Sequence, residues 1–409
     1  MLYQTSNTSK NKLNGFPTVL FTGGGYHIYQ PIEAVVLEDI SDFNKFDNPS
    51  HKFLKFSEQY LTNHKADPLH SPAFKSCLLR VPGSIYCLWR ILCPYLINGK
   101  KLSFDANYYN KRTEGLLTET EGSGGSKFYM NSGSMEAKGF EFSLGWKDNI
   151  SENFTYYFNG NLATTKTKVV STYKEGFVSY SGPSIFKAGL PAGAFYGYVV
   201  EGVYQSYADI LASPATTIGD VAPGDLKFKD LNGDGKITSD DRTMIGNPTP
   251  DFTYGFSVGA DFKGFYFNAD FYGVYGNEVF RNWGNGNSYA PFNYREERLD
   301  RWTGAGTSNW EPRSNSSTAY NRENSTYMIE DGSFFRIRNV QVGYNFDKAL
   351  ISAMKLEGLK LYFNVQNLKT WDHVNGFTPE FGGSATQFGV NTSGYPNPRV
   401  VSFGLSANF

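Results

Sequence analysis

Cysteine and histidine are scarce in this chain, and both are confined almost entirely to its beginning. All three cysteines (Cys77, Cys87 and Cys93) and four of the five histidines precede residue 98. Cysteine spacings of ten and six residues fit neither a disulfide framework nor a metal signature. No Cys/His or Ser/His/Asp arrangement can be defended from the remaining residues. The sequence therefore predicts a protein that is not an enzyme.

Long apolar runs and an excess of one charge are also absent. No stretch of about 18 apolar residues occurs, so no membrane-spanning helix is expected. The net charge is −1 and charged residues make up 19% of the chain, so no basic surface exists for a nucleic acid partner. The mean hydropathy of −0.42 still allows a membrane β-barrel, because barrel strands alternate and barrel loops are polar. Residues 2–10 lack the basic start and apolar core of a signal peptide, so we expect any export signal to be missing from this chain.

Glycine (43 residues), phenylalanine (34) and tyrosine (28) are abundant, which favours turns and strands. From residue 101 onward, apolar residues recur with a period of two, as expected for strands with one apolar face. The stretches with this pattern are residues 102–108, 139–146, 154–162, 195–204, 251–262, 265–275, 333–346, 359–368 and 399–409.

The final stretch has the clearest alternation. One face carries the apolar residues Val401, Phe403, Leu405, Ala407 and Phe409, and the other face is mostly small or polar. A strand of an outer-membrane barrel has such an apolar face toward lipid and a polar or small face toward the lumen. The last strand of a soluble β-sandwich is the alternative.

Two other stretches predict local detail. Residues 251–275 predict a hairpin with a two-residue turn at Lys263–Gly264, and its strands are long enough to cross a membrane at a tilt. Residues 333–346 change phase near Arg338–Asn339, which predicts a β-bulge. The bulge would keep Arg336 and Arg338 opposite the lipid face, where a charge near the midplane costs about 2–4 kcal/mol.

The strands are joined alternately by short turns and long loops, an arrangement typical of barrels. About nine or ten strands are expected after residue 100. The predicted fold class is all-β, an antiparallel transmembrane β-barrel portion over residues 98–409. Residues 1–97 keep neither a strand nor a helix period and form an unassigned, atypical segment. A truncated or frame-shifted gene would explain this segment, and an irregular domain is the alternative.

One stretch matches a metal-binding pattern. Residues 230–241, DLNGDGKITSDD, have the spacing of a twelve-residue calcium loop. The ligands would be side-chain oxygens of Asp230, Asn232, Asp234 and Asp241 and the backbone carbonyl of Lys236. Aspartate at the last position, where a bidentate glutamate is usual, predicts weaker affinity or a more hydrated site. A loop stabilised by Asx and glycine turns without metal is the alternative.

The longest loop, residues 277–330, is rich in aromatic residues. Trp283, Tyr289, Trp302 and Trp310 could stack on the sugar rings of a substrate. Packing within the loop, or an aromatic girdle at the membrane interface, is the alternative.

These patterns are joined by a specific resemblance. Residues 224–256, GDLKFKDLNGDGKITSDDRTMIGNPTPDFTYGF, look like a signature block of the SusC/RagA family of TonB-dependent outer-membrane receptors. Further blocks resemble the same family in the same order, so that the likeness covers roughly residues 101–409. These blocks are YYNKRTEGLL (108–117), NSGSMEAKGFE (131–141), YGYVVEGVYQS (196–206), LDRW (299–302), EDGSFFRIRN (330–339), NVQNL (364–368), GFTPE (376–380) and the terminal strand.

The resemblance implies a 22-stranded barrel in the outer membrane of a Gram-negative bacterium. It implies a plug domain, energy from the TonB system, and a SusD-like lipoprotein that captures glycans or peptides. It also implies that the barrel assembly machinery recognises Val401, Phe403, Leu405 and Phe409 before the strand enters the bilayer. This chain departs from the family in having no TonB box and no plug, so we expect a fragment that does not transport alone.

Two other functions stay open at the level of sequence. One is a secreted calcium-binding β module that binds glycans, and the other is a non-functional gene remnant. The terminal strand distinguishes the first from a membrane barrel, because a soluble module has no use for an outward apolar stripe.

Overall fold

A computed structural model describes residues 18–22, 25–29, 73–81, 84–97, 100–121, 127–172, 178–282, 296–314, 320–352, 355–382, 387–392 and 395–409. The chain forms two compact units, Met1–Ser71 with Ser76–Leu78, and Pro72–Lys75 with Leu79–Phe409. In the first unit, β1 (Thr18–Thr22) and β2 (Gly25–Tyr29) form an antiparallel hairpin. The second unit holds the features described below.

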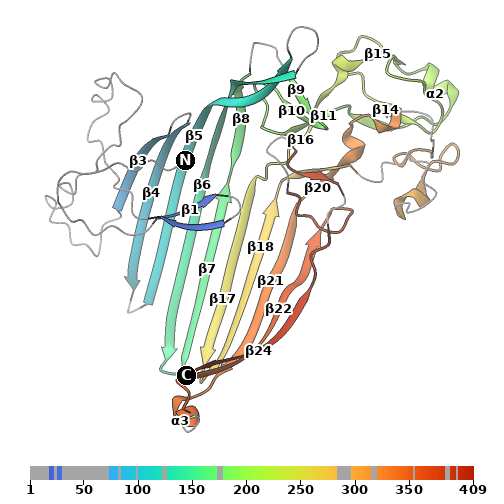
Figure 1. Cartoon of the computed structure of the whole chain (residues 1–409). Helices are drawn as coiled ribbons and strands as arrows, with labels where there is room; N and C mark the ends of the chain where they lie inside the picture. The colour runs from blue at the N-terminus through green and yellow to red at the C-terminus, as the bar shows by residue number, and fades with distance from the viewer. Residues whose placement is uncertain are drawn as a thin grey trace, which may run out of the picture. The chain divides into compact units, whose positions relative to one another are not determined.

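An eleven-stranded sheet dominates the second unit (Figure 1). Its order is β24-β22-β21-β18-β17-β7-β6-β5-β4-β3, and β8 also pairs with β6. The strands are β3 (Ala73–Val81), β4 (Ser84–Ile97), β5 (Lys100–Glu121), β6 (Lys127–Ser151), β7 (Phe154–Thr164), β8 (Lys166–Ser171), β17 (Phe252–Phe262), β18 (Phe265–Tyr275), β21 (Phe334–Asn345), β22 (Gly358–Asp372) and β24 (Val400–Asn408). The pairings from β4 to β24 are antiparallel. The predicted all-β, partial-barrel fold is confirmed.

The sheet starts earlier than the sequence pattern indicated. β4 pairs with β5 along its whole length, from Ser84↔Thr113 to Ile97↔Lys100. The sequence of β4 contains Arg90 and Pro94, which interrupt the alternation and hide the strand from a periodicity argument. The division of the chain at residue 97 stays a prediction.

The two faces of the sheet differ in polarity because side chains alternate along each strand. On one face, apolar residues of neighbouring strands lie opposite each other, for example Phe267↔Val342, Val342↔Phe363 and Phe363↔Phe403. Many of these side chains are exposed to the surroundings, and Phe403 is 72% exposed. We refer to this surface as the apolar face and to the opposite surface as the polar face. At about 3.3 Å per residue, the eleven-residue strands β17 and β18, once tilted, match the roughly 25 Å apolar band of outer-membrane barrels.

Glycines on the polar face make room for tyrosines of the neighbouring strand. A Cβ atom added to Gly404 would lie 2.2 Å from the Tyr362 ring, and one added to Gly259 would lie 2.3 Å from the Tyr157 ring. Each pair is directly opposite or adjacent across the sheet, as in Tyr362↔Gly404. An aromatic ring that covers a glycine fixes strand register and restores packing that the glycine lacks.

Short turns lie at one end of the strands and long insertions at the other. The predicted turn at Lys263–Gly264 is confirmed, with φ of 47° and 86°, the positive values that a tight hairpin turn requires. Lys263 N–H donates to the Asn153 carbonyl at 3.2 Å, which joins neighbouring turns at this end. At the opposite end the chain leaves the sheet after β8 and returns at β17, leaves it after β18 and returns at β21, and leaves it after β22 and returns at β24. The predicted asymmetry of turns and loops is therefore present.

The predicted bulge in β21 is also confirmed. Pairing with β18 shifts between Asp270 and Phe271, and pairing with β22 shifts between Ile337 and Asn339. Arg338 is the extra residue. Arg336 lies opposite Tyr272 on the polar face, so both arginines avoid the apolar face, as predicted.

The first two insertions, with a strand from the third, build a compact loop module. It comprises the described residues of 178–251, 277–333 and 387–391. Its strands are β9 (Ser179–Ser181), β10 (Ser184–Phe186), β11 (Ala194–Gly197), β12 (Val200–Val203), β13 (Ala215–Thr216), β14 (Leu226–Phe228), β15 (Lys236–Ile237), β16 (Thr243–Gly246), β19 (Glu278–Arg281), β20 (Ile329–Asp331) and β23 (Val390–Asn391). They form three small antiparallel or mixed sheets and one parallel pair, β13 with β15.

Helices are few and short among the described residues. They are α2 (Tyr207–Leu211), α3 (Lys348–Ile351) and the 3-10 helices η3 (Ser239–Asp241), η4 (Glu296–Asp300), η5 (Tyr320–Arg322) and η6 (Thr326–Met328). Within the part of the chain that the structure describes, no helix has the length and apolar character to cross a membrane.

A buried core holds the loop module together. Tyr198 stacks on Phe228 with ring centroids 4.8 Å apart, and Phe228 stacks on Tyr320 at 4.7 Å. The prediction of one barrel strand at residues 195–204 is wrong, because β11 and β12 belong to two different sheets of this module. At Gly197 the backbone lies so close to Asn324 that an added Cβ atom would be 2.0 Å from the Asn324 carbonyl oxygen. The apolar residues of the stretch 195–204 fill this core and do not face lipid.

Candidate functional site

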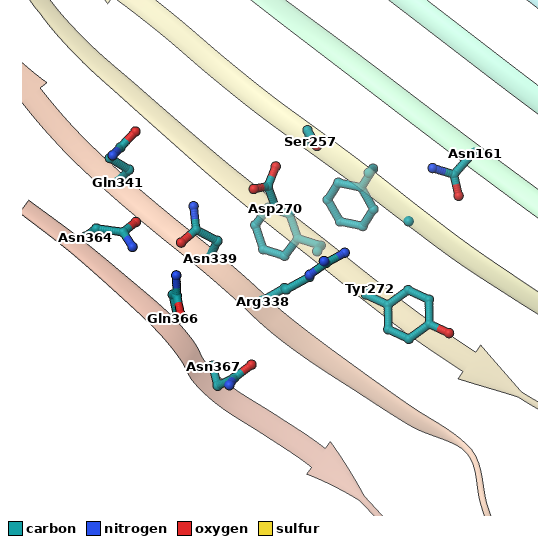
Figure 2. A pocket seen from close by; sticks show the side chains of 13 residues that line it. Asn161, Ser257, Asp270, Tyr272, Arg338, Asn339, Gln341, Asn364, Gln366 and Asn367 are labelled. Atoms are coloured by element: carbon teal, nitrogen blue, oxygen red, sulfur yellow. The ribbon is translucent and has the colours of Figure 1, made fainter. Parts of the chain in front are cut away.

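The polar face of the sheet contains a hollow of about 800 Å³ (Figure 2). We call it the amide hollow, because six of the side chains that line it are carboxamides. Its polar residues are Asn161, Ser257, Asp270, Tyr272, Arg338, Asn339, Gln341, Asn364, Gln366 and Asn367. They come from β7, β17, β18, β21 and β22, and strand alternation aims them at the same side of the sheet.

The bulge positions two of these side chains. Arg338 lies opposite Asn367–Leu368, where pairing passes from Ile337↔Lys369 to Asn339↔Gln366. Asn367 has a φ of 51°, and asparagine tolerates this left-handed conformation better than most residues. The Asn367 side-chain amide donates to the Pro398 carbonyl at 3.0 Å. The bulge thus places the Arg338 guanidinium and the Asn367 side-chain amide among the groups that line the hollow (Figure 2).

A second hollow of about 430 Å³ adjoins the first and shares Tyr272, Arg338 and Asn367 with it. We call it the arginine hollow, and its other lining residues are Arg336, Glu380 and Asn397. The Arg336 guanidinium is 6% exposed and pairs with Glu380 at 2.6 Å. Its Nε donates to Thr370 Oγ1 at 2.8 Å, and Asn397 Nδ2 donates to Glu380 at 2.7 Å. These contacts hold Glu380 and Asn397 against the polar face.

This arrangement is suited to binding polar molecules. Carboxamides both donate and accept hydrogen bonds, so they match sugar hydroxyls and peptide groups. Asp270 and Arg338 add one charge of each sign to the amide hollow. The sequence patterns identified Arg338 by its phase slip, but the amides were not predicted as a site.

Of the four aromatic residues predicted to stack on a substrate, two are described by the structure, and both lie outside the two hollows. Trp283 and Tyr289 fall outside the described residues. Trp302 packs against the core of the loop module, and its indole N–H donates to Gln205 Oε1 at 3.2 Å. Trp310 is 50% exposed, with its ring 6.1 Å from that of Tyr327. Neither tryptophan lines the two hollows, and their role in substrate binding stays a prediction.

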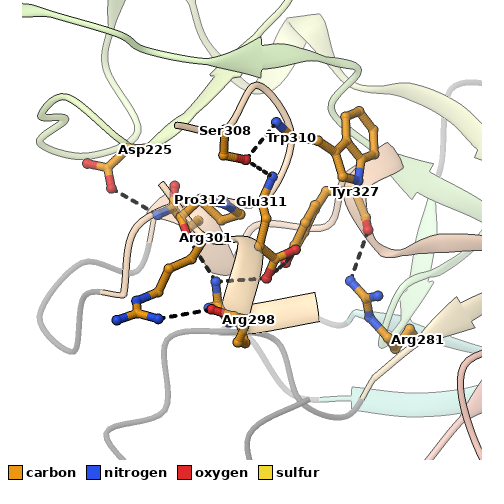
Figure 3. A network of polar contacts seen from close by, with 10 residues as sticks. Asp225, Arg281, Arg298, Arg301, Ser308, Trp310, Glu311, Pro312 and Tyr327 are labelled. Atoms are coloured by element: carbon orange, nitrogen blue, oxygen red, sulfur yellow. Dashed lines mark hydrogen bonds and ion pairs between the residues drawn. The ribbon is translucent and has the colours of Figure 1, made fainter. Parts of the chain in front are cut away.

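A buried polar network beside Trp310 stiffens the loop module (Figure 3). Arg298 pairs with Glu311 at 2.9 Å, and the Tyr327 hydroxyl donates to both Glu311 oxygens at 2.9 Å. Arg281 donates to the Tyr327 carbonyl at 3.1 Å and pairs with Glu330 at 3.1 Å. These contacts join segments far apart in sequence, so no local pattern predicts them.

A second buried carboxylate, Asp225, joins two insertions. It is fully buried and receives a bidentate pair from Arg313 at 2.8 and 2.9 Å. Asn321 Nδ2 donates to the same carboxylate at 2.9 Å. Bidentate arginine–carboxylate pairs are strong and directional, so these contacts fix Arg313 and Asn321 against Asp225.

The predicted calcium loop is exposed and closed by its own hydrogen bonds. Asp230 accepts from the N–H groups of Gly233 (2.7 Å) and Gly235 (2.8 Å). Asn232 and Asp234 accept from the backbone two residues onward, at 2.9 and 2.8 Å. A carboxylate has about four acceptor positions, so free lone pairs remain for a cation. Lys236 begins β15, and its carbonyl role stays a prediction.

Asp241 differs from these residues because it is fully buried. Its carboxylate accepts from the N–H groups of Thr238 (2.8 Å) and Leu231 (2.9 Å), with a longer contact to Asn232. Burial by itself raises the pKa of Asp241, but these backbone donors outweigh it and hold the pKa below its usual value. Among the described residues, no group of three or more His, Cys, Asp and Glu side chains is placed to hold a metal ion. Calcium binding stays a prediction.

The terminal strand presents the expected apolar stripe. Val401, Phe403, Leu405 and Phe409 are 60%, 72%, 64% and 89% exposed. The first three share the apolar face with Val365, Phe363 and Leu361 of β22. Recognition of this stripe by an assembly machinery stays a prediction.

Comparison with known proteins places these features in context. No family model matches the chain. The chain is 32% identical over 335 residues to TonB-dependent receptor P3 of Formosa agariphila, covering 76% of the chain and 32% of that protein. It is 24% identical over 319 residues to TonB-dependent receptor SusC of Bacteroides thetaiotaomicron, covering 74% of the chain and 29% of SusC. The chain thus spans about a third of the length of the curated relatives it matches.

A solved structure shows the same fold. The RagAB peptide transporter matches 83% of this chain and 38% of its own chain, with a TM-score of 0.65 and 20% identity. The RagAB peptide importer in its open-open state gives a TM-score of 0.64. The sheet described here therefore has the fold of part of such a β-barrel.

Proposed function

The chain belongs to the SusC/RagA family of TonB-dependent receptors, and on that premise we propose that it forms part of an outer-membrane receptor that imports an oligosaccharide. The observation that carries this proposal is the two-faced sheet. Its apolar face suits lipid, and its polar face holds the amide hollow. Six carboxamides, a serine and a tyrosine offer the mixed donors and acceptors that sugar hydroxyls need.

The whole receptor would need parts beyond these residues. We propose a plug domain, coupling to the TonB system, and a SusD-like lipoprotein that delivers the substrate above the loop module. The barrel assembly machinery would insert the strands into the outer membrane. The site would bind and pass its substrate unchanged, in keeping with relatives that are named as receptors.

A peptide is the second candidate substrate. The support is the likeness to the RagAB peptide transporter, whose name states its cargo. Carboxamides also pair with peptide groups, so the amide hollow fits both substrates. The secreted calcium-binding module is less favourable, because it would leave the apolar face in water at a cost of about 25 cal/mol per Å².

Uptake by the intact receptor tests the proposal. A strain that lacks the receptor gene would receive the parent gene, Asn364→Ala with Gln366→Ala in the amide hollow, or Asn153→Ala at a short turn. We expect the hollow variant to take up labelled oligosaccharides several-fold more slowly, with Asn153→Ala unchanged. Equal uptake of oligosaccharides with and without the receptor would contradict the proposal, and receptor-dependent uptake of peptides alone would favour the second candidate.

A further inference from the structure

The charges in the arginine hollow are unequal. Two guanidinium groups, Arg336 and Arg338, face one carboxylate, Glu380. Arg336 is occupied, because it is buried and bonded to Glu380 and Thr370. Arg338 is exposed and forms no ion pair among the described residues, although Asp270 lines the neighbouring hollow.

The same hollow already holds one carboxylate from the chain itself. Glu380 sits between Arg336 Nη1 and Asn397 Nδ2, at 2.6 and 2.7 Å. Its side chain is 40% exposed. The Arg336 guanidinium and the Asn397 side-chain amide therefore bind one carboxylate in this hollow. Arg338 adds a second guanidinium to the same hollow.

The backbone irregularity is what brings Arg338 to this place. Without the bulge, alternation would send residue 338 to the same side as Arg336 but in register with a partner of β22. The bulge sets Arg338 at the boundary of both hollows, next to Tyr272 and Asn367. Bulges often re-aim a side chain near a functional site.

The geometry points to an oxyanion subsite at Arg338, with Tyr272 and Asn367 as its neutral neighbours, and so to an acidic oligosaccharide as the cargo. This inference rests on the proposed function and narrows it. The shared chemistry is a carboxylate or sulfate group on the sugar, which arginine binds through paired N–H donors. The neutral hydroxyls of the same sugar would meet the carboxamides of the amide hollow.

Two arms test the subsite on the intact receptor that carries these residues. In the first, crystals are soaked in sodium selenate, and anomalous scattering locates the anion. We expect a peak beside Arg338 that is lost in Arg338→Gln. A peak that persists in that variant, or no peak at Arg338 in the parent, overturns the subsite.

In the second arm, calorimetry measures binding of tetragalacturonate, a sulfated oligogalactoside and neutral maltotetraose. Arg338→Gln should weaken an acidic probe roughly 10- to 100-fold, as for a lost charge-assisted hydrogen bond. Lys369→Gln is the matched control, because Lys369 lies next to the bulge near Trp371 on the apolar face. An acidic probe that binds both variants equally overturns the inference, and the two acidic probes distinguish carboxylate from sulfate.

The arms also separate this inference from the proposed function. A selenate site at Arg338 with no oligosaccharide binding supports the subsite and counts against oligosaccharide import. Arg338-dependent binding of tetraglutamate, with no oligosaccharide bound, overturns the assignment of an acidic sugar. Binding of maltotetraose alone supports oligosaccharide import and overturns the acidic cargo.

Discussion

Arg336 of β21 and Glu380 of the last insertion form an ion pair of 2.6 Å on the polar face of the sheet. The guanidinium is 6% exposed, whereas the carboxylate is 40% exposed. A buried cation that loses its partner is costly, so this pair holds Glu380 against the polar face more firmly than a surface pair would.

Glu380→Gln should therefore loosen that insertion. We expect faster amide hydrogen exchange over residues 373–382 and a loss of about 1–2 kcal/mol of local stability, between the values for exposed and buried pairs. Glu152→Gln at an exposed short turn is the control. Unchanged exchange in Glu380→Gln would show that Thr370 and Asn397 hold the insertion without the ion pair.

Asp241 should make the loop module sensitive to acid. Its folded pKa lies below the ordinary value, so its contribution is present at neutral pH and is lost as pH falls through the folded pKa. Asp241→Asn should lower protection of residues 230–241 by about 1–2 kcal/mol at pH 7, because buried N–H groups lose acceptors. The gap between parent and variant should shrink below about pH 3.9, the ordinary aspartate pKa. A gap that stays constant across this range would assign the effect to packing.

Calcium should bind the 230–241 loop if its exposed oxygens act as ligands. Hard carboxylate and amide oxygens favour calcium over softer-ligand metals. Calorimetric titration of the intact receptor should show a site that the Asp230→Ala, Asp234→Ala double variant lacks. Identical titrations of parent and double variant up to millimolar calcium would assign the loop a purely structural role.

The sheet could be predicted from sequence because its signal is local. Alternation at Phe252, Tyr254 and Phe256 reports directly on which face each side chain occupies. The turn at Lys263–Gly264 and the bulge at Arg338 leave equally local marks in the sequence.

The hollows and the loop module could not be predicted in the same way. The amide hollow needs Asn161 and Gln366, which are brought together only by the strand order of the sheet. The module core stacks Tyr198 on Phe228 and Phe228 on Tyr320, and Tyr320 comes from the next insertion along the chain. The apolar residues of the predicted strand at residues 195–204 belong to this core and not to a lipid face.

Phe409 should matter more for membrane assembly than for the stability of the finished barrel. β24 pairs only with β22 among the described strands, and an unpaired edge is costly in hydrocarbon. Phe409→Ala removes one side chain worth roughly 1.5–3 kcal/mol if fully covered, which is small for a large barrel. We expect little heat-modifiable folded receptor in outer membranes for Phe409→Ala, compared with Phe403→Ala. Normal levels of folded Phe409→Ala would identify the terminal residue as ordinary strand packing.

The apolar face of this sheet should meet lipid, and the polar face should meet an aqueous lumen. Spin labels at single cysteines along β24 test it most directly, in the intact receptor with Cys77, Cys87 and Cys93 replaced by serine. Accessibility to oxygen should be high at Val401, Phe403 and Leu405, and accessibility to a water-soluble nickel chelate should be high at Ser402 and Ser406. A uniform profile, or nickel accessibility that is highest at Phe403, would contradict the account.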